Sequence, residues 1–418
     1  MGASERIETV VVGAGHAGLI ASHLLTQAGR EHVVLESRPT NGGAWQDRWD
    51  EFQLVSPNWT LSFPGLPYDG DDPDGFMARD EIVGRIRRYA EVTRAPLRLG
   101  TEVLRLAQAD NGAGRFRLEL RGRPPILADR VIVATGPFQA PRTHEAAARV
   151  DPAVRQLHVD EYRREADLPP GAVLVVGTGQ SGAQLTEELL EHGRRVVLSV
   201  GRCGRAPRRY RGRDTFGWLH LLATRGSEVG LGLPTAAMLP DLRLRYACNP
   251  HVSGHAGGHT VNLRQFGADG VRLVGRFADA DGRMVRFAPD LAENLAFADR
   301  FFVERFQPDI DKLIDGLGIE APPHEPEQPV AFEPPPVEEI DLVAEGISTI
   351  LWTSGYRLAF GRWIELPIFD DHGFPRTERG VSEIDGLGFV GVPWMTDQGS
   401  ANLIGVARDA QHVVERLS

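Results

Sequence analysis

Two glycine-rich turns carry the residues of this chain whose types and spacing suit the binding of a nucleotide. Each turn follows a β-branched, strand-like run and precedes a helix-like run, which is the context that the Gly-x-Gly-x-x-Gly pattern requires. The first glycine permits a sharp turn, the second lets the backbone approach a pyrophosphate, and the third lets the helix pack closely against the strand. The turns are formed by Gly13, Gly15 and Gly18, and by Gly177, Gly179, Ser181 and Gly182.

An acidic residue stands where the first turn needs one. Glu36 closes the strand-like run at 32–35, and an acid at this place accepts hydrogen bonds from the ribose hydroxyls of an adenosine. The pyrophosphate would lie at the helix N-terminus, where free N–H groups and the helix dipole favour negative charge. One such turn binds one dinucleotide, so two turns in one chain predict two dinucleotides held face to face.

Basic residues replace that acid after the second turn. Beyond the strand-like run at 196–200 no acid appears until Asp214, whereas Ser199 and Arg202 stand at the end of the run. A guanidinium can hold a 2′-phosphate through paired, charge-assisted hydrogen bonds that the bare ribose of NADH does not offer. The second turn is therefore predicted to bind NADPH, with Ser199 and Arg202 at the phosphate.

The elements that must position these residues alternate between strand and helix. Periodicity predicts helices at 79–91 and 290–306, and a C-terminal helix from about Ser400. Further buried strands are predicted near 131–136, 347–352 and 387–392. Residues 203–340 are rich in Arg, Gly and Pro and show the least regular pattern.

Composition and charge limit the kinds of partner that this protein is expected to bind. The 418 residues carry a net charge of −11, which argues against nucleic acid as the main partner. No apolar stretch approaches a membrane span, and the N-terminus lacks a signal-like apolar region. The cysteines, Cys203 and Cys248, are far apart in sequence and form no C-x-x-C pair, so no dithiol centre is expected. We expect a cytoplasmic monomer or homodimer that binds no membrane, nucleic acid or metal.

Several further motifs resemble those of the flavin-containing monooxygenase (FMO-like) family, and in particular a bacterial subgroup of flavin-dependent oxidoreductases. Family motifs are Gly-Gly-Ala-Trp at 42–45, Ala-Thr-Gly at 134–136 and Thr-Ser-Gly-Tyr-Arg at 353–357; subgroup motifs lie at 57–59, 207–214 and 249–252. The resemblance implies an α/β fold of two Rossmann-like dinucleotide-binding domains, the second inserted into the first. The expected bounds are 1–165 for the first part of the FAD-binding domain, 166–335 for the NADPH-binding domain with a substrate-lining insertion, and 336–418 for the C-terminal part of the FAD-binding domain.

The same resemblance implies a reaction. NADPH in the second domain passes a hydride to FAD in the first, and reduced flavin reacts with O2 to give a C4a-hydroperoxide. This species inserts one oxygen atom into a small soft nucleophile, with N-oxygenation favoured. Further FAD contacts are expected from the family motifs and from the start of the C-terminal helix, which would face the flavin pyrimidine. They are Gly43, Trp45, Gly136, Asn402 and Leu403.

The resemblance also suggests two catalytic candidates. Asn58 would lie near the reactive edge of the flavin, where its amide could hydrogen-bond a peroxide, or it is simply a turn residue after Pro57. His158 matches the second half of the family fingerprint at the junction of the two domains, whereas Pro152 and Val154 replace the Phe and Gly of its first half. His158 could transfer a proton or serve as a hydrogen-bonded linker residue, and the second role is favoured.

Two other functions share the same pair of turns. One is an NADPH-dependent flavoprotein reductase or oxidase that releases peroxide or reduces a partner. The other is a non-catalytic FAD-binding redox sensor. Oxygenated product separates the monooxygenase from the first alternative, and flavin bleaching by NADPH separates it from the second.

The Arg202→Ala change tests the predicted choice of nucleotide. Loss of a charged contact to the 2′-phosphate should raise the KM for NADPH by roughly ten- to a hundredfold. The KM for NADH should hardly change, since NADH lacks that phosphate. Steady-state kinetics with both nucleotides measures the two effects, and equal damage to both would mean that Arg202 holds structure or pyrophosphate instead.

Overall fold

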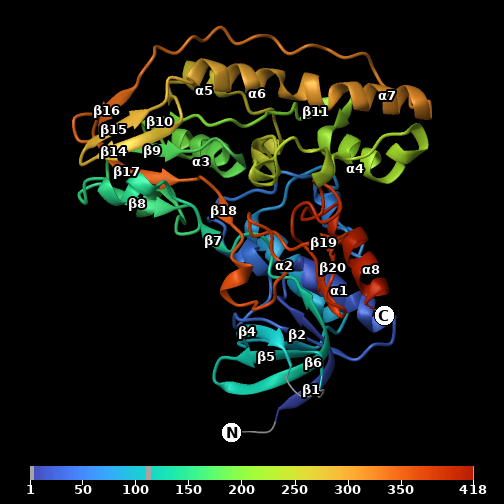
Figure 1. The fold of residues 1–418 in the computed structure, drawn as a ribbon. Coiled ribbons are helices and arrows are strands. Elements are labelled where there is room, and N and C mark those ends of the chain that lie inside the picture. Colours follow the sequence, from blue (N-terminus) through green and yellow to red (C-terminus); the bar gives the residue numbers. More distant parts are fainter. Residues whose placement is uncertain (1–3, 110–113, 418) are drawn as a thin grey trace.

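A mixed sheet with a parallel centre beside the first glycine turn forms the first of two lobes in the computed structural model, which describes residues 4–109 and 114–417 (Figure 1). Strand β1 (Glu5–Val12) lies between β2 (His32–Leu35) and β6 (Arg123–Val133) and runs parallel to both. Val10 and Val11 are fully buried. Both faces of the strand are covered, which explains why its sequence is a continuous β-branched run.

Shorter strands and three helices complete this lobe. The sheet order is β19-β20-β21-β6-β1-β2-β3. Off this path, β5 pairs with β6, and β4 pairs with β5. These strands are β3 (Leu97–Arg98), β4 (Val103–Gln108), β5 (Phe116–Leu120), β19 (Thr377–Glu378), β20 (Val381–Ser382) and β21 (Leu387–Phe389). The helices are α1 (His16–Gln27), α2 (Arg79–Val92) and α8 (Val406–Arg416). Helix α8 packs on α1, so the end of the chain returns to the lobe in which it began (Figure 1).

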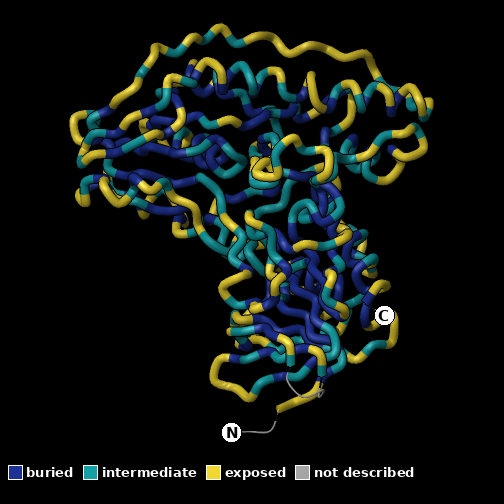
Figure 2. Tube along the Cα trace, in the orientation of Figure 1, coloured by how far each residue is buried: buried dark blue, intermediate teal, exposed yellow. Residues whose placement is uncertain are grey.

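The second glycine turn belongs to a separate five-stranded sheet. Its order is β13-β10-β9-β17-β8, and every pair of neighbours is parallel. The strands are β8 (Arg155–His158), β9 (Ala172–Val176), β10 (Val196–Ser199), β13 (Arg272–Val274) and β17 (Ile347–Trp352), and α3 (Gln180–Glu191) follows β9. The central strands are buried along their length (Figure 2).

The poorly patterned region contributes a helical layer to the second lobe. Its helices are α4 (Thr215–Arg225), α5 (Leu263–Ala268), α6 (Leu291–Arg305) and α7 (Gln307–Leu317). Its strands are β11 (Arg209–Tyr210), β12 (Arg213–Asp214), β14 (Phe277–Asp281), β15 (Met284–Phe287) and β16 (Glu339–Asp341). The proline-rich stretch at 321–337 has no helix or strand and crosses the lobe from α7 to β16 (Figure 1). Between the lobes, β7 (Ala140–Pro141) pairs with β18 (Tyr356–Arg357).

The α/β fold of two dinucleotide-binding units, one inserted into the other, is confirmed. The strand pairings nevertheless shift the expected boundaries, because β8 and β17 were assigned to the first domain and lie in the second sheet. We therefore propose a second domain that extends from β8 to β17. The C-terminal helix also begins later than expected, at Val406. The hydroxyl of Ser400 accepts hydrogen bonds from the backbone N–H groups of Thr396 and Asp397, which holds this stretch as a turn.

The first turn should tolerate no side chain at Gly13. This residue has φ +108°, and a Cβ there would stand 2.6 Å from the carbonyl oxygen of Ala134. We expect Gly13→Ala to destabilise the protein by more than about 3 kcal/mol. Gly29→Ala is the matched control, since φ is +67° and nothing lies within 4 Å of the added Cβ; it should cost about 1 kcal/mol. Thermal unfolding compares the two, and equal shifts would refute the steric argument.

Candidate active site

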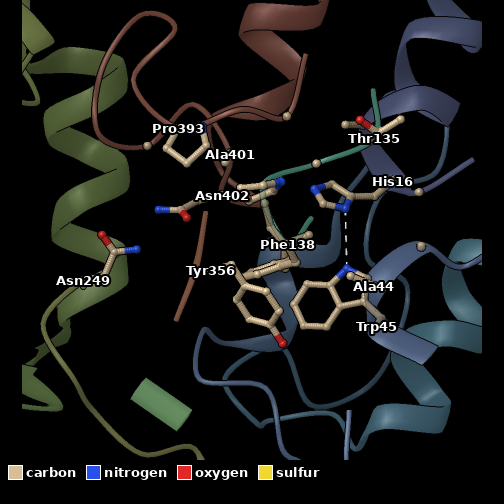
Figure 3. A pocket seen from close by; sticks show the side chains of 18 of the residues that line it. His16, Ala44, Trp45, Thr135, Phe138, Asn249, Tyr356, Pro393, Ala401 and Asn402 are labelled. Carbon is tan, nitrogen blue, oxygen red and sulfur yellow. Dashed lines mark hydrogen bonds between the residues drawn. The ribbon is translucent and has the colours of Figure 1, made fainter. Parts of the chain in front are cut away.

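A cavity of about 680 Å³ contacts both lobes and the loops that join them. Its wall in the first lobe comes from the first glycine turn, the loop around Trp45 and the segment at 134–138. The other side comes from the segment at 245–250, the 355–356 loop and the turn before α8. Figure 3 shows His16 and Trp45 facing Phe138 and Tyr356, with Asn249 on the opposite side.

The first turn leaves the space that a pyrophosphate needs. A Cβ on Gly18 would stand 1.9 Å from the oxygen of Gly13, so this glycine is required for packing. A Cβ on Gly15 would contact only the Cα of Gly43, at 3.6 Å, and would project into the cavity that Gly15 lines. Gly15 caps α1 without a side-chain hydrogen bond. The first N–H groups of α1 therefore remain available to an anion.

Glu36 is fixed by the turn that it serves. One carboxylate oxygen accepts the N–H of Ala14 at 2.9 Å, and the other accepts the N–H of Arg38 at 3.0 Å. The residue is buried, yet it lines the cavity. Because each carboxylate oxygen can accept more than one hydrogen bond, Glu36 can also receive ribose hydroxyls. Gly13, Gly15, Glu36, Gly43, Trp45 and Gly136 all line the same cavity, as do Asn402 and Leu403.

The second turn repeats the geometry of the first. Gly177 has φ +109°, and a Cβ on Gly182 would stand 2.0 Å from the oxygen of Gly177. Gly179 caps α3 without a side-chain hydrogen bond. Gln180, the first residue of α3, lines the cavity, whereas Gly177, Gly179, Ser181 and Gly182 are not among its lining residues. The start of α3 therefore reaches, through Gln180, the cavity that the first turn lines.

Charged and aromatic side chains that the sequence analysis did not single out surround this space. The indole Nε1 of Trp45 donates to Nδ1 of His16 at 3.5 Å, and burial lowers the pKa of His16 to about 4, so its imidazole is neutral. Arg48 lies 4.8 Å from the ring of Phe138. Burial lowers the pKa of Arg48, and its buried Nε has no hydrogen-bond partner among the described residues. Burial also raises the pKa of Tyr356 to about 12.

The comparisons with known proteins agree with this geometry. Residues 10–211 match the family described as Pyridine nucleotide-disulphide oxidoreductase. The chain is 27% identical to an uncharacterized CzcO-like oxidoreductase of Geobacillus kaustophilus, over 98% of both chains. It is 31% identical to the indole-3-pyruvate monooxygenase YUCCA1 of Oryza sativa, over 51% of this chain and 54% of that one. A flavin-containing monooxygenase from Stenotrophomonas maltophilia has the same fold, with a TM-score of 0.66 at 21% identity over 99% and 98% of the two chains.

These sequence similarities support the resemblance to FMO-like flavin-dependent oxidoreductases, and the structural neighbour shows the same fold.

Neither of the two catalytic candidates is among the residues that line the cavity. The amide of Asn58 donates to the oxygen of Asp72 at 2.9 Å and accepts the N–H of Met77 at 2.7 Å. Asn58 is buried and does not line the cavity, so it holds its own loop together.

His158 is likewise a positioning residue. Its Nδ1 contacts a carboxylate oxygen of Asp160 at 2.6 Å, and its Nε2 contacts the carbonyl oxygen of Gly355 at 3.1 Å. The ring meets that of Tyr356 edge-on, with 4.9 Å between the centroids. His158 does not line the cavity. Both nitrogens hold the loop that carries Tyr356, which agrees with the linker role.

The two residues predicted at the 2′-phosphate differ in placement. Ser199 is buried; its hydroxyl donates to the oxygen of Gly275 at 3.0 Å and accepts the N–H of Phe277 at 2.8 Å. The Ser199 hydroxyl is therefore used by the protein's own backbone and is not exposed to a ligand. Arg202 is exposed, contacts Glu293 at 3.1 Å and lies 4.3 Å from the ring of Phe297. Only Arg202 remains available for a phosphate.

The predicted contacts at the C-terminal helix are also shifted. Asn402 and Leu403 line the cavity, but they belong to the turn before α8 and not to its first residues, because Gly405 is the residue that caps this helix. Within residues 4–109 and 114–417, no cluster of His, Cys, Asp and Glu could hold a metal, and no helix is long and apolar enough to cross a membrane.

Gly15→Val tests the first turn directly. The valine fits the extended backbone of this residue but fills the space for the pyrophosphate. We expect purified Gly15→Val to fold, with wild-type circular dichroism, and to lose nearly all bound flavin. Gly84→Val on the exposed side of α2, where nothing lies within 4 Å of an added Cβ, is the control and should keep its flavin. Absorbance spectra of both proteins measure the flavin content, and full flavin in Gly15→Val would contradict the site.

Proposed function

We propose that this protein is an FAD- and NADPH-dependent monooxygenase that inserts one oxygen atom from O2 into a small soft nucleophile, with N-oxygenation favoured. The observation that carries this proposal is the single cavity that the first turn and the start of α3 both reach. A hydride donor on one helix N-terminus and its acceptor on the other would share that space. A protein that bound two nucleotides only for structure would have no reason to join their sites.

The residues present fit FAD on the first turn. The empty space beside Gly15 would take the pyrophosphate, and Glu36 would accept the ribose hydroxyls. NADPH would bind the second turn, with Arg202 beside its 2′-phosphate. When bound, FAD would supply the redox chemistry: reduced by NADPH, it would activate O2, through the C4a-hydroperoxide that the family resemblance implies, for transfer of one oxygen atom.

The side chains of the cavity would exclude water and place charge. Trp45, Phe138 and Tyr356 form an aromatic wall around the space between the two turns. Arg48 brings a positive charge into this wall, and its Nε has no hydrogen-bond partner within residues 4–109 and 114–417. A fixed cation in a site with little water stabilises negative charge more strongly than in bulk solvent. Arg48 would therefore favour the anionic form of a reduced ring or of a peroxide.

Residues of the 203–340 region contribute another part of the cavity wall. Its lining residues are mostly apolar and include Phe216, Leu219, Leu233 and Phe306. An apolar wall favours a substrate with an apolar body, and the neutral imidazole of His16 adds no competing charge. A small amine or another soft nucleophile on a hydrophobic frame fits this space better than a highly charged metabolite.

Oxygen labelling tests the proposal. Purified protein is supplied with NADPH, ¹⁸O2 and a panel of small amines, sulfides, oximes and ketones, and product, NADPH and peroxide are measured together. We expect one labelled oxygen atom in an amine-derived product and peroxide well below the NADPH consumed. Peroxide equal to NADPH with every compound would identify an oxidase, and no flavin bleaching by NADPH would identify a sensor.

A further inference from the structure

The fold brings together the two cysteines that are far apart in the sequence. The N–H of His251 donates to the oxygen of Gly204 at 2.9 Å, and the N–H of Ala206 donates to the oxygen of His251 at 3.2 Å. These bonds lay the segment after Cys248 beside the segment after Cys203. The Sγ of Cys203 also lies 3.5 Å from the carbonyl oxygen of Asn249, the residue that follows Cys248. The expectation of no dithiol centre considered only spacing along the chain, whereas the fold brings the segments of the two cysteines together.

The two thiols lie in different surroundings. Cys203 is buried, and its Sγ contacts the oxygens of Gly204 and Asn249, both at 3.5 Å, and Nδ1 of His251 at 3.4 Å. Cys248 is exposed and lines the cavity. Interaction with Cys248 and burial raise the pKa of Cys203, and interaction with Cys203 lowers the pKa of Cys248. Cys248 is thus the reachable thiol of the pair and the one that more readily ionises.

Cys248 also lies against the second glycine turn. A Cβ on Gly179 would stand 3.4 Å from the Cβ of Cys248. The side chain of Gln180 holds the segment that follows Cys248. Its Nε2 donates to the oxygen of Val252 at 2.8 Å, and its Oε1 accepts the N–H of Val252 at 3.2 Å. Gly179 is the residue that the backbone of this turn presents to a pyrophosphate. A nucleotide on this turn and a reagent aimed at Cys248 would therefore compete for the same space.

We propose that Cys203 and Cys248 form an oxidation site for peroxide, in which Cys248 reacts first and Cys203 closes a disulfide over the second nucleotide turn. Only the competition with NADPH rests on the proposed function; the disulfide itself does not. A source of peroxide lies in the same cavity if reduced flavin there reacts with O2 without a substrate. The disulfide would then hold the 248–252 segment against Gly179 and weaken nucleotide binding.

The chemistry balances with hydrogen peroxide as the oxidant. The Cys248 thiolate attacks one peroxide oxygen, the O–O bond breaks, and hydroxide leaves and takes up a proton to form water. Cys248 is then a sulfenic acid. The sulfur of Cys203 attacks the sulfur of Cys248, the S–OH bond breaks, and the hydroxide leaves as a second water with the proton of Cys203. Two thiols are oxidised and one peroxide is reduced, so no further reagent is needed.

Mass spectrometry of the flavin-loaded protein tests this site. Treatment with one equivalent of hydrogen peroxide should lower the intact mass by two hydrogen atoms, and digestion should yield one cross-linked peptide pair holding residues 203 and 248. Dithiothreitol should reverse both changes. Conversion of Cys248 to the sulfinic acid without a cross-link, or reaction of Cys203 before Cys248, would overturn the proposal.

Two variants separate the roles of the thiols. Cys203→Ser should leave Cys248 reactive, so peroxide adds oxygen to Cys248 and forms no cross-link. Cys248→Ser should leave the buried Cys203 unmodified under the same treatment. If Cys203 oxidised equally fast in Cys248→Ser, the assignment of Cys248 as the reactive thiol would be wrong. Both variants can be judged by mass and by circular dichroism, whatever their activity.

The effect of NADPH on the reactivity of Cys248 provides a further measurement. A pair of thiols with only a structural role would not change this effect. Alkylation of Cys248 by iodoacetamide should slow by about tenfold when free NADPH is at ten times its Kd, as mass action requires. The peroxide-treated protein should bind NADPH more weakly than the reduced protein in a fluorescence titration, and reduction should restore binding. A cross-link that forms without protection by NADPH would support the dithiol and count against the nucleotide site on the second turn. Protection of Cys248 by NADPH without a cross-link would support the nucleotide site on the second turn and contradict the dithiol.

Discussion

The close approach of a helix N-terminus to the end of a parallel strand is the constraint on which this structure depends. It occurs twice, at α1 and at α3, and each time a Cβ on the third glycine would stand within about 2 Å of the first glycine's oxygen. Because no side chain fits between them, the helix can begin directly at the end of the strand. The free N–H groups of its first turn then point to the open end of the sheet. That direction makes the end of each sheet a site for an anion. Glu36 is held by the same turn through the N–H of Ala14.

The second constraint is the path by which the chain joins the two sites. β17 lies in the second sheet, and the chain leaves it through the 353–357 loop to return to the first lobe. His158 on β8 contacts this loop at Gly355, and Tyr356 projects from it into the cavity. The 353–357 loop thus connects the second sheet directly to the wall of the cavity. A residue such as His158 can matter for the reaction through this connection, without touching a reactant.

Electrostatics distinguishes the cavity from an ordinary domain interface. Arg48 has lost much of its water and holds a nitrogen without a hydrogen-bond partner, which is costly for a folded protein unless a ligand provides the partner. Burial keeps His16 neutral in the same cavity, and Cys248 lines that cavity with a thiol of lowered pKa. A fixed positive charge in such a site favours negative charge nearby, and the cavity places the Cys248 thiol beside the second glycine turn.

The amino-acid sequence by itself determined the local features of this protein. The strand, turn and helix at each nucleotide site could be predicted because glycine spacing and β-branched runs act over a few residues, and Glu36 could be predicted because its distance from the turn is part of the same local unit. The sequence could not decide which sheet β8 and β17 join, since parallel pairing connects residues far apart in the chain. For the same reason it could not show that the amide of Asn58 and the hydroxyl of Ser199 bond to the protein's own backbone, that Arg48 enters the cavity, or that Cys203 meets Cys248. Those contacts exist only once the 203–251 segment folds back and the lobes close on each other, so tertiary packing alone decides them.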